Sequence, residues 1–251
     1  IGAGTARVLA REGYRLALLA RRVERLRALA AELPRAADGE HLALGCDLCE
    51  PAQIRASFAQ VRDAFGRLDL LVNNAGIGYR ARVEESDDRE IARVLATNVG
   101  ALLACCREAL PLLVRGERPC VVNVSSVVGR RGMPTMAAYA ASKAAVFSIG
   151  ESLRLEWAHH GIAVCTIAPG VTATEIFAVQ ANPSKLHDPD LAQADSPESV
   201  GEQILALDRR PVPERYLRWK WKWLGALSVI APRLADRALG SRDWIPRAPA
   251  R

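Results

Sequence analysis

The fold of this chain is decided by the stretch Val122–Val146, VNVSSVVGRRGMPTMAAYAASKAAV. Its first residues continue an apolar run typical of a buried strand, and its alanine-rich second half favours a helix. Tyr139 and Lys143 are four residues apart in that second half, so a helix places both side chains on one face. Ser126 follows the strand, at the end where open α/β sheets bind their ligands.

Ser126, Tyr139 and Lys143 together are suited to proton transfer at an oxygen atom. A neighbouring cation favours the ionised phenol, so we expect Lys143 to lower the pKa of Tyr139 from its usual value of about 10. A tyrosine tuned in this way can exchange a proton with an alcohol or carbonyl oxygen near neutral pH. A Tyr-x-x-x-Lys pair by itself also arises by chance in helices, so the interpretation needs support from the rest of the chain.

Short apolar runs alternate with helical segments on both sides of this stretch. Such alternation, with connections this long, predicts parallel strands joined by right-handed crossovers and therefore a doubly wound α/β sheet. A chain of 251 residues, half of them apolar, can bury the core of one such domain. The predicted strands are Leu16–Leu19, Leu42–Leu44, Leu68–Val72, Val121–Val124 and Ala163–Ile167, and the predicted helices are Arg22–Leu33, Pro51–Phe65, Asp87–Arg115 and Met136–His159.

Three further motifs occur in an order that chance does not readily explain. They are Asn73-Asn74-Ala75-Gly76 after a predicted strand, Asn98 within ATNVG, and the segment Pro169-Gly170-Val171-Thr172-Ala173-Thr174 after another predicted strand. With these motifs the chain resembles the short-chain dehydrogenase/reductase family from Ile1 to about Leu207. The resemblance implies a Rossmann-type fold of three layers and hydride transfer with a nicotinamide cofactor.

The resemblance also implies a role for each catalytic residue. Tyr139 is the general acid/base and Ser126 holds the substrate oxygen, whereas Ser125 is expected to be structural. Lys143 binds the nicotinamide ribose and acidifies the tyrosine, and Asn98 supports a water through which protons reach solvent. Cofactor contacts are expected from Gly2, Asp47, Leu48, Asn74, Ala75, Gly76, Tyr139, Lys143, Pro169, Gly170, Thr172 and Thr174.

Two of the cofactor assignments depend on short stretches with alternatives. The end of the strand before Arg21 carries Ala20, where an acidic residue would hold the ribose of NAD. Cations there suit a 2′-phosphate, so we predict NADP rather than NAD, with Arg21 as the main contact and Arg22 as a helper. Arg22 could instead begin a solvated helix face, and Asp47 could cap the helix that follows Pro51.

The beginning of the chain differs from the family pattern. The family opens with a strand and a T-G-x-x-x-G-x-G turn, and Ile1-Gly2 resemble the last two residues of that turn. We therefore expect the natural reading frame to extend upstream by one strand and most of the phosphate-binding loop. Gly2 would let the following helix approach the sheet and the phosphates closely.

The six cysteines and four histidines predict no metal site. Cys46 and Cys49 have the spacing of half a metal site or of a redox pair, but no second pair and no matching histidine accompanies them. We expect the cysteines to be small buried hydrophobic residues.

The basic charge of the chain is concentrated after the predicted domain of residues 1–208. Residues 209–251 hold eleven Lys/Arg against three acidic residues, in a chain of net charge +6. Within this extension, Arg218–Trp223 alternates cations with indoles, and Leu224–Ala231 is too short to span a bilayer. The extension could pack on the domain as a flap or subunit contact, or residues 218–231 could touch a membrane surface. Nucleic acid is not expected as a partner, because no other motif for it is present.

These features predict an NADP-dependent carbonyl reductase or secondary-alcohol dehydrogenase. The irregular segment of residues 172–196 is expected to form a lid, and its apolar residues suggest a lipophilic substrate. The alternatives are an NADP-binding regulatory protein without turnover, and a dehydratase or epimerase on the same fold. We expect a homo-oligomer in the cytoplasm, with a peripheral position at a membrane surface as the alternative.

Overall fold

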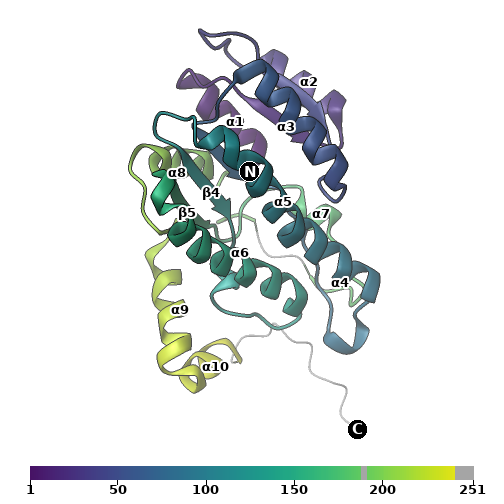
Figure 1. The fold of residues 1–251 in the computed structure, drawn as a ribbon. Coiled ribbons are helices and arrows are strands. Elements are labelled where there is room, and N and C mark those ends of the chain that lie inside the picture. Colours follow the sequence, from purple (N-terminus) through teal and green to yellow (C-terminus); the bar gives the residue numbers. More distant parts are fainter. Residues whose placement is uncertain (188–190, 241–251) are drawn as a thin grey trace.

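The computed structural model describes residues 1–187 and 191–240 (Figure 1). Its core is built on parallel strands. Each strand pair named in the sheets runs parallel, as the alternation of strands and helices predicted. The strands are β1 (Ala17–Ala20), β2 (Leu42–Gly45), β3 (Leu70–Asn73), β4 (Cys120–Val124), β5 (Ala163–Ala168) and β6 (Glu214–Tyr216).

Helices connect the strands at the positions expected from the sequence. The predicted helix Asp87–Arg115 is composite, because a π-turn, η2, interrupts it at Asn98. The helices are α1 (Gly2–Arg11), α2 (Val23–Glu32), α3 (Pro51–Phe65), α4 (Asp88–Leu95), α5 (Ala101–Leu113), α6 (Ala137–Glu156), α7 (Ile176–Val179), α8 (Pro197–Arg209), α9 (Trp219–Ile230) and α10 (Pro232–Gly240). The short turns are η1 (Val83–Glu85), η2 (Ala96–Gly100), η3 (Val127–Gly129) and η4 (Ala158–His160).

Strand β4 shows why the fold has three layers. Successive side chains of a strand point to opposite faces of the sheet. Val121 packs in a core cluster with residues of α3, α5 and α6, whereas Val122 packs in a second cluster with Val200 and Ile204 of α8. A strand that is buried on both faces reads as a continuous apolar run, which is the pattern that predicted this strand.

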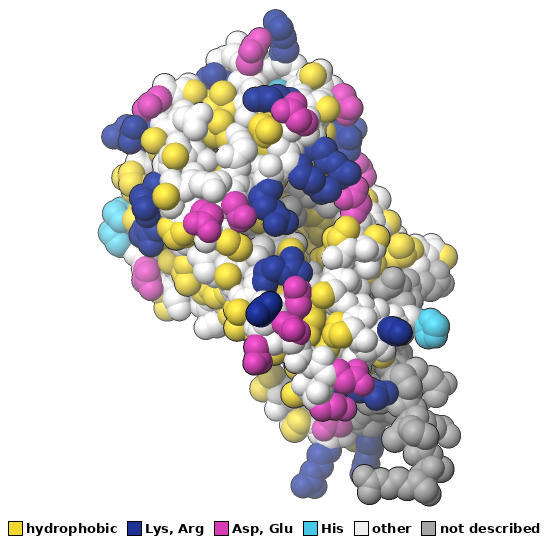
Figure 2. Space-filling model, turned by 90° about the vertical axis from the view of Figure 1, so that its right-hand side faces the viewer, with side chains coloured by type: hydrophobic (Ala, Val, Ile, Leu, Met, Phe, Trp, Pro, Cys, Tyr) yellow, Lys and Arg dark blue, Asp and Glu magenta, His cyan; other side chains and the backbone are white. Residues whose placement is uncertain are grey.

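The C-terminal extension forms two helices at one end of the molecule. Helices α9 and α10 pack on each other and follow β6 below the sheet in the view of Figure 1. Lys and Arg side chains project from this end in the space-filling view (Figure 2). Within the described residues, one helical stretch, Asp88–Leu113, is long and apolar enough to span a bilayer by length and composition. This stretch is the composite helix α4–η2–α5, which packs against α3, α6 and β3.

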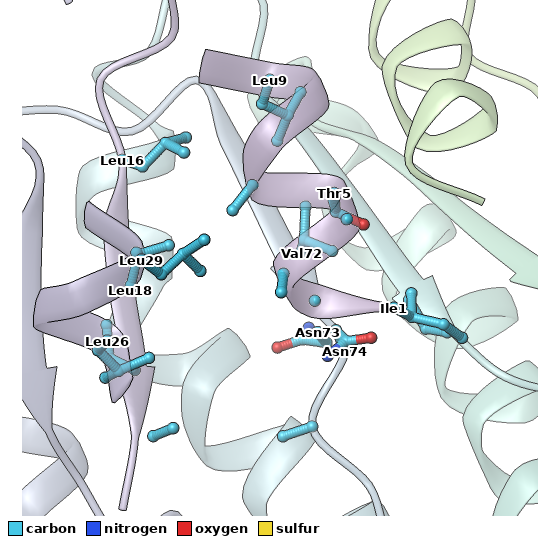
Figure 3. Close-up of a pocket in the computed structure, with 18 of the residues that line it drawn as sticks. Ile1, Thr5, Leu9, Leu16, Leu18, Leu26, Leu29, Val72, Asn73 and Asn74 are labelled. Carbon is cyan, nitrogen blue, oxygen red and sulfur yellow. The ribbon is translucent and has the colours of Figure 1, made fainter. Parts of the chain in front are cut away.

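The strands form two separate sheets. One sheet has the order β1-β2 and the other has the order β3-β4-β5-β6, so β1 and β3 each have one edge without a strand partner among the described residues. A cavity of about 1650 Å³ extends between these edges and beneath α1. Leu16 and Leu18 face it from the β1 side, and Val72 faces it from the β3 side (Figure 3).

Candidate active site

Ser126 and Tyr139 are brought together by contacts between the end of β4 and α6. The Ser125 hydroxyl donates to the carbonyl of Lys143 at 2.7 Å, and the Lys143 ammonium donates to the carbonyl of Val124 at 2.9 Å. Gly129 permits this approach, because a Cβ atom at this position would lie 2.6 Å from the Lys143 carbonyl oxygen. Ser125 is therefore part of the framework, as the sequence indicated, while Ser126 lies close enough to the Tyr139 phenol to affect its pKa.

The electrostatics of this pair differ from the prediction. Burial raises the pKa of Tyr139 to about 12, and the hydrogen bond with Ser126 opposes that rise. Burial also lowers the pKa of Lys143 to about 8. The Lys143 nitrogen lies 5.9 Å from the centre of the tyrosine ring and is held by a backbone carbonyl. The expectation of a lowered tyrosine pKa is therefore wrong for this structure, because desolvation of the phenolate outweighs the opposing effect of Ser126.

Asn98 is buried in the π-turn and makes three hydrogen bonds with its amide group. Its oxygen accepts from the backbone N–H of Ile77 at 2.8 Å, and its nitrogen donates to the carbonyl of Ile77 at 3.0 Å. The same nitrogen donates to the hydroxyl of Ser142 at 2.9 Å, and that hydroxyl donates to the carbonyl of Tyr139 at 2.7 Å. Asn98 thus ties the loop after β3 to α6. Its predicted role in holding a water stays a prediction.

The Asn-Asn-Ala-Gly loop lies against both the catalytic residues and α1. A Cβ atom on Gly76 would lie 3.2 Å from the Asn98 oxygen and 3.2 Å from the Lys143 nitrogen, so a glycine allows the close approach. A Cβ atom on Gly2 would lie 2.7 Å from the amide nitrogen of Asn74. The loop residues Asn74, Ala75 and Gly76 line the cavity together with Gly2, Tyr139 and Lys143, whereas Ser126 lies outside its wall.

The predicted contacts at the adenosine end are only partly brought to the cavity. Leu48 and Arg22 line it, but Arg21 does not. The carboxylate of Asp47 accepts a hydrogen bond from the backbone N–H of Cys49 at 2.9 Å, so it stabilises the turn before α3. Asp47 and Arg21 are therefore not part of the cavity wall.

The segment after β5 is also only partly placed in the cavity. Thr174 lines it, together with the lid residues Ile176 and Val179. Thr172 is buried, and its hydroxyl donates to the carbonyl of Gly170 at 3.4 Å within the same loop. Pro169 accepts a hydrogen bond from the backbone of the turn that follows Ser126. Pro169, Gly170 and Thr172 thus shape the loop and do not form the wall of the cavity.

Glu175 and Arg25 belong to this region although the sequence did not single them out, and Trp221 of the C-terminal extension also reaches it. Glu175 of the lid lies 3.2 Å from Arg25 and 3.4 Å from Arg22, and these pairs join the lid to α2 across the cavity. Both guanidinium groups hold the pKa of the Glu175 carboxyl below its usual value. Trp221 of α9 lies over the loop after β5, since a Cβ atom on Gly170 would lie 3.3 Å from the indole nitrogen.

Arg130 and Arg131, in the loop after Ser126, hold the C-terminal part of the chain. Arg130 pairs with Glu214 of β6, and its guanidinium carbon lies 4.0 Å from the centre of the Phe147 ring. Arg131 pairs with Asp236 of α10.

The cysteines and histidines form no metal site in residues 1–187 and 191–240. No group of three or more His, Cys, Asp or Glu in this part of the chain could hold a metal ion. Cys46 is buried and Cys49 is exposed, and both are free thiols.

Comparison with known proteins agrees with this geometry. Residues 1–184 match the family model described as short chain dehydrogenase. An uncharacterised oxidoreductase of Mycobacterium tuberculosis is 35% identical over 240 residues, covering 94% of this chain and 92% of that protein. Dehydrogenase/reductase SDR family member 7B of Bos taurus is 34% identical over 252 residues, covering 96% of this chain and 78% of that protein.

Similar folds are also present among solved structures. An alcohol dehydrogenase from the archaeon Thermococcus sibiricus, solved with 5-hydroxy-NADP, superposes with a TM-score of 0.76 at 26% sequence identity. The match covers 86% of this chain and 90% of that one. The parallel sheet and the layers of helices are therefore those of a dinucleotide-dependent dehydrogenase fold.

Proposed function

Because the chain belongs to the short-chain dehydrogenase family, we propose that it is an NADP-dependent oxidoreductase that interconverts a carbonyl group and a secondary alcohol. The observation that supports this reaction most directly is that Ser126 lies beside the Tyr139 phenol, while Tyr139 and Lys143 line the cavity. A protein that only binds a nucleotide has no need of a phenol, a hydroxyl and an ammonium arranged in this way. The apolar lid residues Ile176 and Val179 favour a lipophilic substrate.

The residues of the chain act on the substrate oxygen. When bound, the nicotinamide dinucleotide supplies or accepts the hydride. Tyr139 holds its proton at neutral pH, since its pKa is raised to about 12, and a protonated phenol is the donor that carbonyl reduction requires. The hydroxyl of Ser126 donates a second hydrogen bond to the same oxygen, where negative charge develops. The Lys143 ammonium, with a pKa of about 8, remains charged at pH 7 and stabilises the phenolate that is left.

The residues around the cavity fit a dinucleotide. Gly76 keeps the backbone close to Lys143 and Asn98, and Gly2 opens α1 beside Asn74, so that the start of this helix lies in the cavity wall. A helix N-terminus presents free N–H groups and favours phosphate oxygens. These features support binding of a pyrophosphate near Gly2 and a nicotinamide near Lys143.

The preference for NADP is proposed to depend on Arg22 and Arg25. Both side chains line the cavity, and the last residue of β1 is Ala20, not a carboxylate. A 2′-phosphate would take the place that Glu175 now has against the two guanidinium groups. This arrangement replaces the earlier expectation of Arg21 as the main contact.

A further strand is proposed between β1 and β3. Their facing edges leave backbone N–H and C=O groups without strand partners among the described residues, and leucines line the space between them. A parallel strand that precedes α1 in the natural reading frame would pair with both edges. The intact mass of the native protein tests this, because a mass equal to the 27.2 kDa of the present chain would contradict it.

A homo-oligomer and a cytoplasmic location are also proposed. Apolar side chains are exposed on the helices beside the site, namely Leu95, Leu103 and Leu155, and a second copy could cover them. The six cysteines are free thiols, as is usual in a reducing compartment.

The reaction is tested with Tyr139→Phe on a panel of ketones and aldehydes, measured as oxidation of NADPH. We expect kcat to fall by about 10²–10⁴, because a positioned general acid contributes that much. Tyr216→Phe is the matched control, since Tyr216 is also half-buried, its pKa is also raised to about 12, and it lies outside the cavity wall. Equal loss in both variants, or no loss in Tyr139→Phe, would contradict the proposal.

A further inference from the structure

Helix α9 exposes one apolar face along its whole length. Trp219, Trp223 and Ile230 are spaced by four and seven residues, so they share one side of the helix. Their exposed fractions are 76%, 67% and 83%. Leu227 lies on the same side and is 37% exposed. Large apolar side chains gathered in this way on a surface mark an interaction site.

The opposite face of α9 is fixed on the body of the protein. Trp221 lies over Gly170, and Gly225 is buried against Arg130, where a Cβ atom would lie 3.2 Å from the arginine Cβ. Arg218, just before the helix, pairs with Asp195 at 3.0 Å and so holds its beginning. The helix therefore cannot turn its exposed face inward without losing these contacts. The face with the tryptophans remains directed at solvent.

Cations flank this face. At about 100° of rotation per residue, Lys220 and Lys222 lie on opposite sides of the line through Trp219 and Trp223. On the neighbouring helix α10, Arg233 is exposed one turn before a second exposed arginine, Arg237. None of these four cations forms an ion pair with an acidic residue of the described part of the chain. Figure 2 shows Lys and Arg side chains projecting at this end of the molecule.

We propose that the outer face of α9 docks on the surface of an anionic lipid bilayer. The indoles of Trp219 and Trp223 and the side chain of Ile230 would enter the interface between headgroups and acyl chains, and Lys220 and Lys222 would extend sideways to lipid phosphates. At 12 residues α9 is too short to cross the bilayer, so it lies in the plane of the surface. The docking does not depend on the proposed reaction.

Two other occupants fit the surface less well. A second copy of this chain in a twofold contact would bring the cations of α9 and α10 from both copies to one interface, and like charges gathered there repel. Single-stranded nucleic acid would suit the lysines and indoles, but the aliphatic side chains of Val229 and Ile230 offer its bases no ring for stacking. An anionic bilayer satisfies both the apolar face and the cations.

The test is sedimentation of the whole protein with lipid vesicles. We expect the protein to pellet with vesicles of phosphatidylcholine and phosphatidylglycerol, and to remain in the supernatant with phosphatidylcholine alone. Trp219→Ser with Trp223→Ser should abolish pelleting. Lys220→Gln with Lys222→Gln should lower the partition coefficient roughly 30-fold, because each cation near an anionic surface contributes about a factor of five.

Matched controls separate docking from general effects of charge or folding. Arg11→Gln with Arg89→Gln removes two exposed cations elsewhere, and Leu155→Ser removes an exposed apolar side chain of α6. We expect both controls to pellet like the parent protein, and all variants to keep the circular dichroism spectrum of the parent. Absence of pelleting, equal pelleting with neutral vesicles, or equal loss in the controls would overturn the proposal. A concentration-dependent dimer that Trp219→Ser abolishes would assign the face to a second copy and would also overturn it.

Discussion

Replacement of Asn98 by alanine tests the view that this residue joins the loop after β3 to α6. The substitution removes three hydrogen bonds of 2.8, 3.0 and 2.9 Å and leaves both backbone groups of Ile77 without their partner. At about 1 kcal/mol net for each hydrogen bond, we expect the free energy of unfolding to fall by about 3 kcal/mol. A loss of this size is a large part of the stability of an ordinary domain.

Urea denaturation followed by circular dichroism measures this loss. With a slope of about 3 kcal/mol per molar, the midpoint should move down by about 1 M. Thr97→Ala is the control from the same π-turn, since within residues 1–187 and 191–240 the Thr97 hydroxyl hydrogen-bonds with the Cys49 thiol alone, at 3.3 Å. We expect it to change the free energy of unfolding by about 0.5 kcal/mol. If Asn98→Ala were no more destabilising than this control, the three hydrogen bonds would not be what holds the loop.

Asn98→Asp tests which of the Asn98 hydrogen bonds are donated and which are accepted by its side chain. Its carboxylate could still accept from Ile77 N–H, but it would face the carbonyl of Ile77 and could donate to neither that carbonyl nor Ser142 unless protonated. The folded state should therefore raise the pKa of the new carboxyl. Its destabilising effect should be present above that pKa and shrink as the pH falls through it. A deficit independent of pH would contradict the hydrogen-bond assignment.

Three further predictions concern charge and packing. Burial lowers the pKa of Lys143 to about 8, and the unfolded chain binds that proton more tightly, so the free energy of unfolding of the parent protein should rise by about 3 kcal/mol between pH 8 and pH 10. Lys143→Met should remove this rise. Unfolding measured at several pH values checks it. Gly201→Ala should destabilise the protein by about 1–3 kcal/mol, since the new Cβ atom would lie 2.9 Å from the Cα atom of Thr5 in the facing helix α1. Gly100→Ala should stabilise it by up to about 1 kcal/mol, because no atom lies within 4 Å of the new Cβ. Thermal unfolding compares the two variants. Arg22→Ser with Arg25→Ser should raise KM for NADPH about tenfold and leave KM for NADH unchanged, and equal effects on both would contradict the proposed phosphate site.

Much of the fold was predictable from local sequence patterns. The apolar run of β4 and the alanine-rich α6 have periodicities that belong to one type of element, so their identity does not depend on distant residues. Strand β6 is weakly marked in the sequence, and its pairing partner, β5, lies far away along the chain. The interruption of α4–α5 by a π-turn was not predicted, because it is held by contacts with Ile77 and Ser142, which are far away in the sequence.

The site was predictable in its residue types and less so in its electrostatics. Spacing placed Tyr139 and Lys143 on one face of a helix, but the effect of burial on each pKa depends on what surrounds them. The same holds for Arg21 and Arg22, adjacent in the sequence, of which only Arg22 lines the cavity. The partner of Arg22, Glu175, belongs to a segment about 150 residues further along the chain, and pattern alone does not connect them.

The sequence by itself determined that strands and helices alternate, that the strands are parallel, and which side chains carry the chemistry, since these depend on periodicity and residue type within short segments. The tertiary structure alone decided which groups lose their water, which cations pair with acids, and which face of α9 remains exposed. Desolvation and charge pairing depend on atoms brought together from distant parts of the chain, and the order of residues along the chain does not specify those distances.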